Sequence, residues 1–149
     1  GGWDKNFGAE GKDPVAADTA IAAKEGGENL KPAAKGTYMV VYDPAAGTLA
    51  LSSDFWGIVG DAYGWEADHF MLPAGSGQWV SYNQEISGGW KIRKGAAWDV
   101  SAGGNYTAAG EAITAVTDNG PNIAVTDMTR FDVVYDTKAG TITVSKPAK

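Results

Sequence analysis

The sequence contains no cysteine and a single histidine. Without cysteine there is no disulfide framework and no thiolate metal site, so a metal would have to rely on oxygen ligands. Positive charge is also scarce, because the net charge is −6 and the pI is about 4.6. An acidic chain is a poor match for the phosphates of nucleic acid or for an anionic membrane surface. We therefore expect no nucleic-acid partner and no cofactor.

Long apolar runs are absent as well. No segment approaches the roughly 20 apolar residues of a membrane-spanning helix, so no direct membrane span is predicted. The sequence carries neither a signal peptide nor a lipid-attachment cysteine. If the protein is exported, we expect its targeting or anchoring segment to lie outside these 149 residues.

What the chain does have is glycine, aromatic residues and short apolar segments. Hydrophobic residues make up 44% of the chain and there are 21 glycines, which predicts a packed core broken by many turns. Five of the six tryptophans lie between Asp54 and Asn105, in short strand-like segments separated by Gly-rich turns. This stretch is the part of the chain around which we expect the fold and the binding surface to be organised.

An internal repeat divides the sequence. Residues 38–52 match residues 131–145 without a gap, with about half of the positions identical. Upstream, Gly27-Glu-Asn-Leu matches Gly120-Pro-Asn-Ile, and Trp3-Asp-Lys-Asn-Phe-Gly8 matches Trp98-Asp-Val-Ser-Ala-Gly103. Residues 1–53 therefore read as the C-terminal half of a repeat module, and residues 54–149 as a complete module.

Each repeated unit has the pattern of a β-hairpin. Phe131, Val133 and Tyr135 alternate with Asp132, Val134 and Asp136, and Asp136-Thr-Lys-Ala-Gly140 supplies the turn. About seven such strands at this spacing predict an all-β fold, an Ig-like antiparallel β-sandwich. The first copy lacks the strands that should cover its apolar face. We therefore expect it to pack against the complete module or against a neighbouring chain.

Strand alternation also assigns faces. It places Trp90 and Ile92 opposite Lys91 and Arg93, and makes Trp56 and Trp90 core residues. It likewise groups Val80, Tyr82, Gln84 and Ile86 on one face of a strand. The Ala-rich stretches Pro14–Lys24 and Thr107–Val116 occupy equivalent places in the two copies, so one structure should serve both. That structure is a short helical turn or an ordered loop, and we favour the loop.

Catalytic and metal motifs are weak. His69 could in principle join Ser76 or Ser81 in a triad, but no nucleophile motif supports it and a loop histidine is expected. A calcium ion could be bound near Asp118 and Asn119, although the EF-hand pattern is absent. Gly57-Ile-Val-Gly60 lacks the Lys of a phosphate-binding loop, and Gly103-Gly104 is expected to form a turn. No pair of carboxylates stands out as a glycosidase site, so we expect no enzyme activity.

The aromatic residues are the more informative feature. Exposed indole rings offer apolar planes on which the C–H face of a sugar can lie, and nearby charged groups can bond its hydroxyls. Trp65, Trp98, Lys91 and Arg93 could form such a set. For the two tryptophans, a core position is the alternative. For Lys91 and Arg93, the alternative is an ordinary solvated strand face.

The same residues resemble a known family, the modules of the SusE and SusF outer-membrane starch-binding lipoproteins of Bacteroidetes glycan-uptake systems. The likeness is carried by Gly57-Ile-Val-Gly-Asp61, Trp65, Met71, Trp90-Lys-Ile-Arg93, Trp98-Asp99 and Gly103-Gly104. It covers residues 54–149 in full and 1–53 in part. Similar modules also occur as accessory starch-binding domains of some amylases and pullulanases.

The resemblance implies tandem Ig-like β-sandwiches at the cell surface, anchored to the outer membrane and associated with a transporter complex. It implies a non-catalytic module that binds α-glucan or starch, an oligo- or polysaccharide. In that family two aromatics in an arc and basic or amide side chains hold the sugar. Lys91 and Trp98 match that site best, followed by Trp65 and Arg93. The rival hypothesis is a structural spacer or protein-interaction sandwich, in which Trp65 and Trp98 are buried.

Overall fold

The computed structural model describes residues 5–148 and divides into two compact units, Gly1–Phe55 and Trp56–Lys149. The expected boundary between residues 53 and 54 lies two residues ahead of this division. Apart from one single-turn 3₁₀ helix, η1 (Asp61–Tyr63), all regular structure in the described residues is β-strand. The all-β prediction is confirmed. Each unit is described by itself below.

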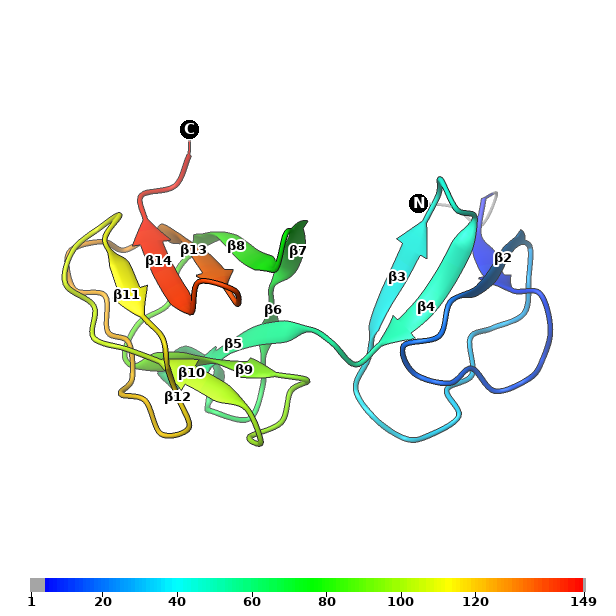
Figure 1. Ribbon diagram of the computed structural model, residues 1–149, viewed down its shortest axis with the longest axis horizontal. Helices are drawn as coiled ribbons and strands as arrows, with labels where there is room; N and C mark the ends of the chain where they lie inside the picture. The colour runs from blue at the N-terminus through cyan, green and yellow to red at the C-terminus, as the bar shows by residue number, and fades with distance from the viewer. Residues whose placement is uncertain (1–4, 149) are drawn as a thin grey trace. The chain divides into compact units, whose positions relative to one another are not determined.

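The second unit is a sandwich of two antiparallel sheets (Figure 1). One sheet has the order β12-β10-β9-β5-β6 and the other the order β11-β14-β13-β8-β7. The arrangement agrees with the predicted Ig-like sandwich. The strands of this unit are β5 (Trp56–Gly60), β6 (His69–Phe70), β7 (Leu72–Gly75), β8 (Gln78–Gln84), β9 (Trp90–Lys94), β10 (Ser101–Gly103), β11 (Ala112–Thr114), β12 (Val116–Thr117), β13 (Phe131–Asp136) and β14 (Thr141–Ser145).

The core lies between the two sheets and follows strand alternation. Trp90 and Ile92 of β9 face inward from one sheet, and Val133 of β13 faces inward from the other. The ring of Trp90 stacks on Phe131 with centroids 6.1 Å apart, which joins the sheets directly. Burying each large apolar side chain contributes about 1.5 to 3 kcal/mol. The expected core positions of Trp56 and Trp90 are confirmed.

Strand β8 departs from simple alternation. Ser81 pairs with the core residue Val133, whereas Val80 pairs with Val134 and points to the other face, and both Ser81 and Val80 are buried. The register then shifts at Asn83, which has a positive φ of 51° and donates its backbone N–H to Asp132 Oδ1 at 2.7 Å. Val80, Tyr82, Gln84 and Ile86 were predicted to share one face of the strand. Because of this bulge the prediction is wrong for Gln84 and Ile86, which follow Tyr82. It also gives the buried Asp132 carboxylate a partner.

The first unit is a single four-stranded antiparallel sheet in the order β1-β2-β4-β3 (Figure 1). Its strands are β1 (Phe7–Ala9), β2 (Ile21–Glu25), β3 (Met39–Asp43) and β4 (Thr48–Ser52). Backbone pairing makes β1 the counterpart of β10, β2 that of β11 and β12 together, and β3–β4 that of β13–β14. The unit therefore has no counterpart of β5 to β9 in its described residues.

The two hairpins of the repeat have the same turn. In each, an aspartate at the end of the first strand accepts two backbone N–H groups: Asp43 Oδ1 from Ala45 and Ala46, and Asp136 Oδ1 from Lys138 and Ala139. The glycine that closes the turn has φ of +63° at Gly47 and +64° at Gly140. That region of backbone space favours glycine, so the turn is set by local sequence in both units.

The upstream part of the repeat is a close crossing of two backbone segments. A Cβ atom on Gly8 would lie 2.2 Å from the carbonyl oxygen of Glu28, and one on Gly103 would lie 2.1 Å from that of Pro121. The turn expected at Gly103-Gly104 is wrong, because Gly103 is the last residue of β10. Glycine is needed at this position because the backbone of Pro121 passes too close for a side chain. Trp3 and Asp4 of the predicted match lie outside the described residues.

The Ala-rich stretches share one structure, as expected, but it is neither helix nor plain loop. Pro14–Lys24 runs into β2, and Thr107–Val116 contains β11 and enters β12. Within them Ala23 donates its N–H to Gly47 O at 2.9 Å, and Ala115 does the same to Gly140 O at 2.8 Å. Alanine is a weak strand former, which hid these strands from the sequence.

Candidate functional site

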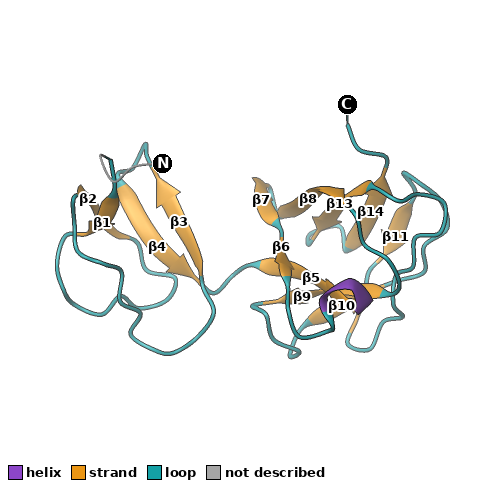
Figure 2. Cartoon of the chain, turned by 180° about the vertical axis from the view of Figure 1, so that it is seen from behind, coloured by secondary structure: helices purple, strands orange, loops and turns teal. Residues whose placement is uncertain are grey.

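The candidate site lies on the outer face of the sheet β12-β10-β9-β5-β6. Trp90 and Ile92 face the core, so Lys91 and Arg93 of β9 point to the other side. Arg93 pairs across the sheet with Gly57 on β5 and with Ser101 on β10. Residues 61–68, including η1, follow β5 and return to pair β6 with it, and Figure 2 shows η1 drawn beside this layer.

Asp61 fixes the start of this segment. Its Oδ2 accepts the backbone N–H of Gly89 at 2.7 Å, and its Oδ1 accepts the indole N–H of Trp65 at 2.7 Å. These two bonds, the Gly89 bond first, hold the pKa of Asp61 below its ordinary value. A Cβ on Gly88 would lie 2.4 Å from Asp61 Oδ2, so glycine leaves room for the carboxylate. Asp61 therefore sets the orientation of the Trp65 ring.

Trp65 and Trp98 lie next to each other although they come from different loops. Their ring centroids are 6.2 Å apart with an interplanar angle of 29°. Trp98, in the turn between β9 and β10, is 51% exposed, and Trp65 is half-buried. The alternative core position is thus wrong for Trp98, and the two indoles form one aromatic patch at the surface.

Arg93 lies on the predicted face, but the alternative of a solvated strand face is wrong for it. Its Nε and Nη2 donate to Asp68 Oδ1 at 2.8 Å and Oδ2 at 2.6 Å, and Nη2 also donates to the backbone oxygen of Glu66 at 3.1 Å. Both side chains of this ion pair are almost fully buried. Arg93 is therefore held in place by the protein and is not available to bond a ligand.

The guanidinium nevertheless reaches the aromatic patch. Its Cζ atom lies 4.6 Å from the ring centroid of Trp98, a cation–π contact. The space for Asp68 depends on Gly57, because a Cβ there would lie 2.9 Å from the Cβ of Asp68. Arg93 and Asp68 thus support Trp98 from beneath, and Gly57 makes the pair possible.

Lys91 is the remaining predicted site residue. It lies two residues before Arg93 on the same face of β9 and is half-buried. Among residues 5–148, no hydrogen bond or ion pair is formed by its ammonium group. The structure thus brings Trp65, Arg93 and Trp98 into contact and places Lys91 on the same sheet face.

Sequence reasoning missed the two carboxylates that organise the site. Asp61 belongs to the segment Gly57–Asp61 that carries the family resemblance, but it was not predicted to be a site residue. Asp68 precedes His69 in the sequence and was given no role. The pairing of Gly57 with Arg93 across β5 and β9 could have indicated a partner for the arginine, because a glycine beside Arg93 leaves room for another side chain, here that of Asp68. That signal needs the strand register, which a single sequence does not supply.

The triad hypothesis gains no support. His69 lies in β6 and not in a loop, pairs with Ile58, and stacks on Tyr63 at 6.1 Å. Partial burial lowers the pKa of His69. Within the described part of the chain, no hydrogen bond joins His69 to Ser76 or Ser81. An open depression of about 360 Å³ includes both His69 and Ser81 in its lining.

Metal ligation is equally unsupported. Across residues 5–148 no group of three or more His, Cys, Asp or Glu side chains is placed to hold an ion. Asp118 and Asn119 have φ of 51° and 72° in the turn after β12, where the first unit has the single residue Gly26 at 65°. Their positive φ reflects a longer turn at this point of the repeat.

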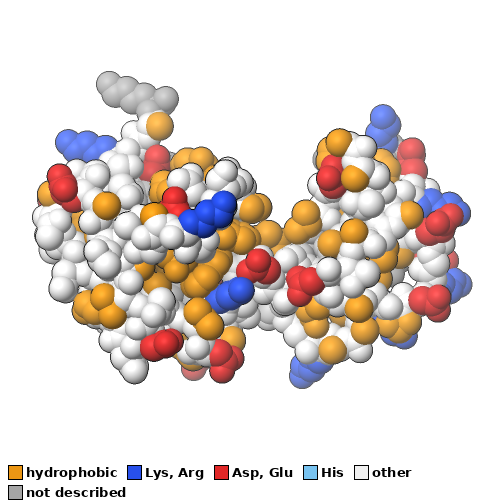
Figure 3. Space-filling view, in the orientation of Figure 1, with side chains coloured by type: hydrophobic (Ala, Val, Ile, Leu, Met, Phe, Trp, Pro, Cys, Tyr) orange, Lys and Arg blue, Asp and Glu red, His pale blue; other side chains and the backbone are white. Residues whose placement is uncertain are grey.

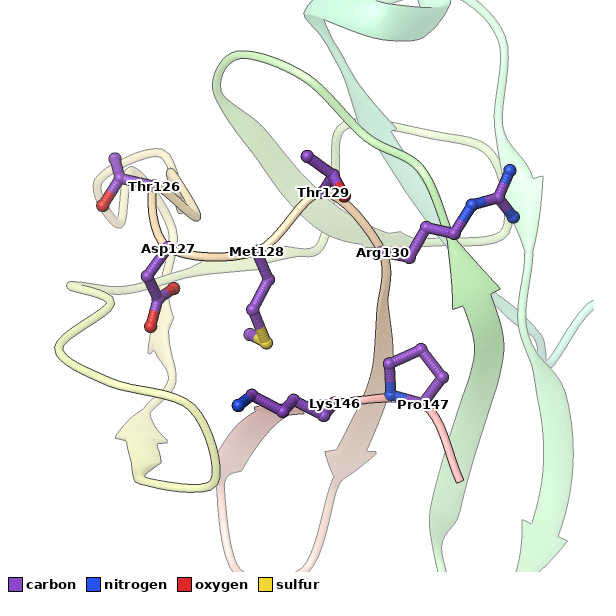
Figure 4. A pocket seen from close by; sticks show the side chains of 7 residues that line it. All are labelled: Thr126, Asp127, Met128, Thr129, Arg130, Lys146 and Pro147. Atoms are coloured by element: carbon purple, nitrogen blue, oxygen red, sulfur yellow. The ribbon is translucent and has the colours of Figure 1, made fainter. Parts of the chain in front are cut away.

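A depression of about 520 Å³ lies along residues 126–130 and the chain after β14 (Figure 4). Met128 and Lys146 point into the same space, whereas Arg130 points away and pairs with Glu85 at 2.8 Å. Asp127 accepts the hydroxyl of Tyr106 at 2.6 Å, and burial together with this carboxylate raises the pKa of Tyr106 to about 12. The charged groups of Asp127 and Arg130 are thus paired with Tyr106 and Glu85, which do not line the depression, and they do not converge on its space.

The outer-face arrangement is suited to binding. Among residues 5–148 it offers an aromatic patch, the unpaired ammonium group of Lys91 and a rigid support, but no nucleophile bonded to a base. No helix in the described residues is long and apolar enough to cross a membrane. No family model, curated protein or solved structure matches this chain. The resemblance to starch-binding lipoprotein modules stays a prediction.

Proposed function

We propose that the second unit is a non-catalytic carbohydrate-binding module whose ligand is an α-glucan such as starch. The observation that supports this most is the patch formed by Trp65 and Trp98 on the same outer face as Lys91. Indole faces provide a large apolar area with little rotamer entropy to lose, and Lys91 can donate to sugar hydroxyls. The choice of α-glucan rests on the resemblance alone.

The residues divide into two roles under this proposal. Trp98, Trp65 and Lys91 contact the sugar, whereas Arg93, Asp68 and Asp61 are positioning residues that hold the two rings. The same resemblance suggests an outer-membrane lipoprotein at the cell surface, anchored through a segment outside this sequence and associated with a transporter complex. Fractionation of cells that express the complete polypeptide tests that location.

Binding is tested by titrating the protein with maltoheptaose and a panel of other oligosaccharides in a calorimeter. Trp98→Ala should weaken binding at least about tenfold, or about 1.4 kcal/mol. Lys91→Ala should weaken it by a smaller factor. Tyr82→Ala is the matched control, because Tyr82 is an exposed aromatic residue on β8 of the other sheet. No heat with any glycan, or equal effects of Trp98→Ala and Tyr82→Ala, would refute the proposal.

The positioning role is tested by breaking the buried ion pair. Asp68→Ala leaves the Arg93 charge without its partner and should cost about 3 to 5 kcal/mol of stability, with glycan affinity lost in parallel. The double variant Arg93→Met/Asp68→Leu should recover much of that stability. Its affinity should stay low, because the support beneath Trp98 is gone. Full affinity in the stable double variant would show that the pair does not position the ring.

The rival function, a spacer or protein-interaction module, requires Trp65 and Trp98 to be buried. Trp98 is 51% exposed, which argues against a spacer or protein-interaction module with buried tryptophans. Acrylamide quenching of tryptophan fluorescence, compared between the parent chain and Trp98→Phe, measures this exposure in solution. A specific surface in the first unit does favour protein contact, and it is independent of the carbohydrate site.

A further inference from the structure

Equivalent positions of the repeat differ sharply in burial. Val133 is fully buried, whereas its counterpart Val40 is 59% exposed; Tyr135 is 5% exposed and its counterpart Tyr42 is 41% exposed. Val40 and Tyr42 lie on the same face of the sheet as Leu51 and Leu49, to which they are paired. Leu49 and Leu51 are themselves only 4% and 5% exposed, so the part of this face that the first unit leaves open lies on β3. Figure 3 shows hydrophobic side chains reaching the surface of this unit, on the right.

The same unit has two open sheet edges. In the second unit, β13 pairs with β8, and β10 pairs with β9. Their counterparts β3 and β1 are the outer strands of the first sheet, and no strand within residues 5–148 pairs with their outer edges. On β1 the backbone of Ala9 is already bonded to Glu28, at 2.8 and 2.9 Å, so that edge is open only ahead of Ala9. An open edge offers unpaired backbone groups to an added strand. Strands equivalent to β8 and β9 would pair with the open edges, and the segment that carries them would also cover the open face.

The second unit shows what covers this face. Trp56 and Ile58 of β5 and Trp90 and Ile92 of β9 fill the space that β13 and β14 line. Strand β9 ends at Lys94, and residues 95–100 lead directly into β10. Because β1 is the counterpart of β10, the equivalent covering segment would end just ahead of β1 in the same polypeptide.

We propose that the open face of β3, formed by Val40 and Tyr42 beside the buried Leu49 and Leu51, is the docking surface for a half-module of the same repeat, joined ahead of residue 1 in the same polypeptide. This half-module adds a β8-like strand to the edge of β3 and a β9-like strand to the edge of β1. The first unit is thereby the second half of a complete sandwich. The proposal does not depend on the carbohydrate site.

One detail defines the side chain that the half-module carries. In the second unit Trp56 packs edge-on against Tyr135 at 4.7 Å, in a core that also contains the small Ala102. In the first unit Phe7 stands in place of Ala102 and stacks on Tyr42 at 5.0 Å. Phe7 and Trp56 thus contact equivalent tyrosines of the two units. The docking half-module therefore has a residue smaller than tryptophan at that position.

The test joins a second copy of residues 54–95, with Trp56→Ala in that copy, ahead of Gly1 of the full chain. Amide hydrogen exchange is measured in β1 and β3. We expect the amide of Phe7, and those amides of Met39–Asp43 that face away from β4, to gain at least about 100-fold protection over the parent chain, because their edges become paired. Unchanged exchange at both strands would overturn the proposal.

Charged substitutions at Val40 and Val41 distinguish docking on one face of β3 from a general effect on stability. In the joined chain Val40→Asp should abolish the protection, whereas Val41→Asp, on the opposite face of β3, should keep it. In the parent chain Val40→Asp should leave the unfolding midpoint unchanged, since the face is uncovered there; a large destabilisation would overturn the proposal. Sedimentation showing a parent-chain dimer with β1 and β3 already protected would assign the face to a second copy instead, and would also overturn it.

Discussion

The two units of this chain carry the same hairpin under opposite conditions. In the second unit the hairpin β13–β14 is one wall of a closed sandwich. In the first unit its counterpart β3–β4 has an open edge at β3, where Val40 and Tyr42 are exposed. The turn, the closing glycine and the crossing at Gly8 or Gly103 are nevertheless the same. Local backbone chemistry thus sets the shape of the repeat, whereas burial depends on strands that lie far away in the sequence.

The largest difference is expected at the first residue of the hairpin. Phe131→Ala removes a fully buried ring that stacks on Trp90 and should cost about 3 to 5 kcal/mol. Tyr38→Ala, at the equivalent place, removes a partly exposed ring and should cost about 1 kcal/mol or less. Urea unfolding followed by tryptophan fluorescence reports the second unit, and hydrogen exchange at β4 reports the first. Equal costs would mean that the two faces are covered alike.

The closing glycines should instead give equal effects. Gly140→Ala and Gly47→Ala place a Cβ in open space, so only the positive φ of 64° or 63° opposes them. Each should cost about 1 to 2 kcal/mol of strain. Hydrogen exchange at β14 and β4 measures the two costs separately. A cost confined to one unit would show that the turn depends on its surroundings.

The smallest effect concerns one aspartate in each unit. Hydrogen bonds from Ser53 lower the pKa of Asp18, and those from Gly89 and Trp65 lower that of Asp61, both below the ordinary 3.8. A carboxyl group with a lowered folded-state pKa stabilises the fold above the unfolded-state value, and this contribution is lost as the pH falls through the folded-state pKa. Carboxyl carbon NMR titrations from pH 5 to 2 should give both midpoints below 3.8.

The variant Asp61→Asn provides the control for this titration. It should remove the midpoint in the second unit, leave that of Asp18 unchanged, and alter the fluorescence of Trp65 at every pH, since the ring loses its charged acceptor. A midpoint for Asp61 at or above 3.8 would contradict the bonding geometry.

Much of the fold could be read from the sequence because it follows from short-range patterns. Alternation placed Trp90 in the core, and Asp136 to Gly140 announced the turn of the repeated hairpin. The predictions that were wrong concern features that form only when segments distant in the sequence pair with each other. The strands at Ala112–Thr114 and Ile21–Glu25 form because an edge was available, and the bulge at Asn83 forms because Asp132 accepts its amide.

The site shows the same division. Alternation alone put Lys91 and Arg93 on the outer face, and the structure has them there. It could not tell that Arg93 is enclosed, because the residue that encloses it, Asp68, arrives from a loop 25 positions away in the sequence. The contact of Trp65 with Trp98 likewise depends on two loops meeting, which no periodicity encodes.

The bond between the Trp65 indole N–H and Asp61 has a consequence for selectivity. An indole has one polar hydrogen, and here it is already used. A guest lying on this ring can be recognised only by its flatness and its C–H groups, whatever the stereochemistry of its nearest hydroxyl. Under the proposed function, discrimination between one monosaccharide and its epimer would then rest on other donors of this face, such as the indole N–H of Trp98 and the ammonium group of Lys91.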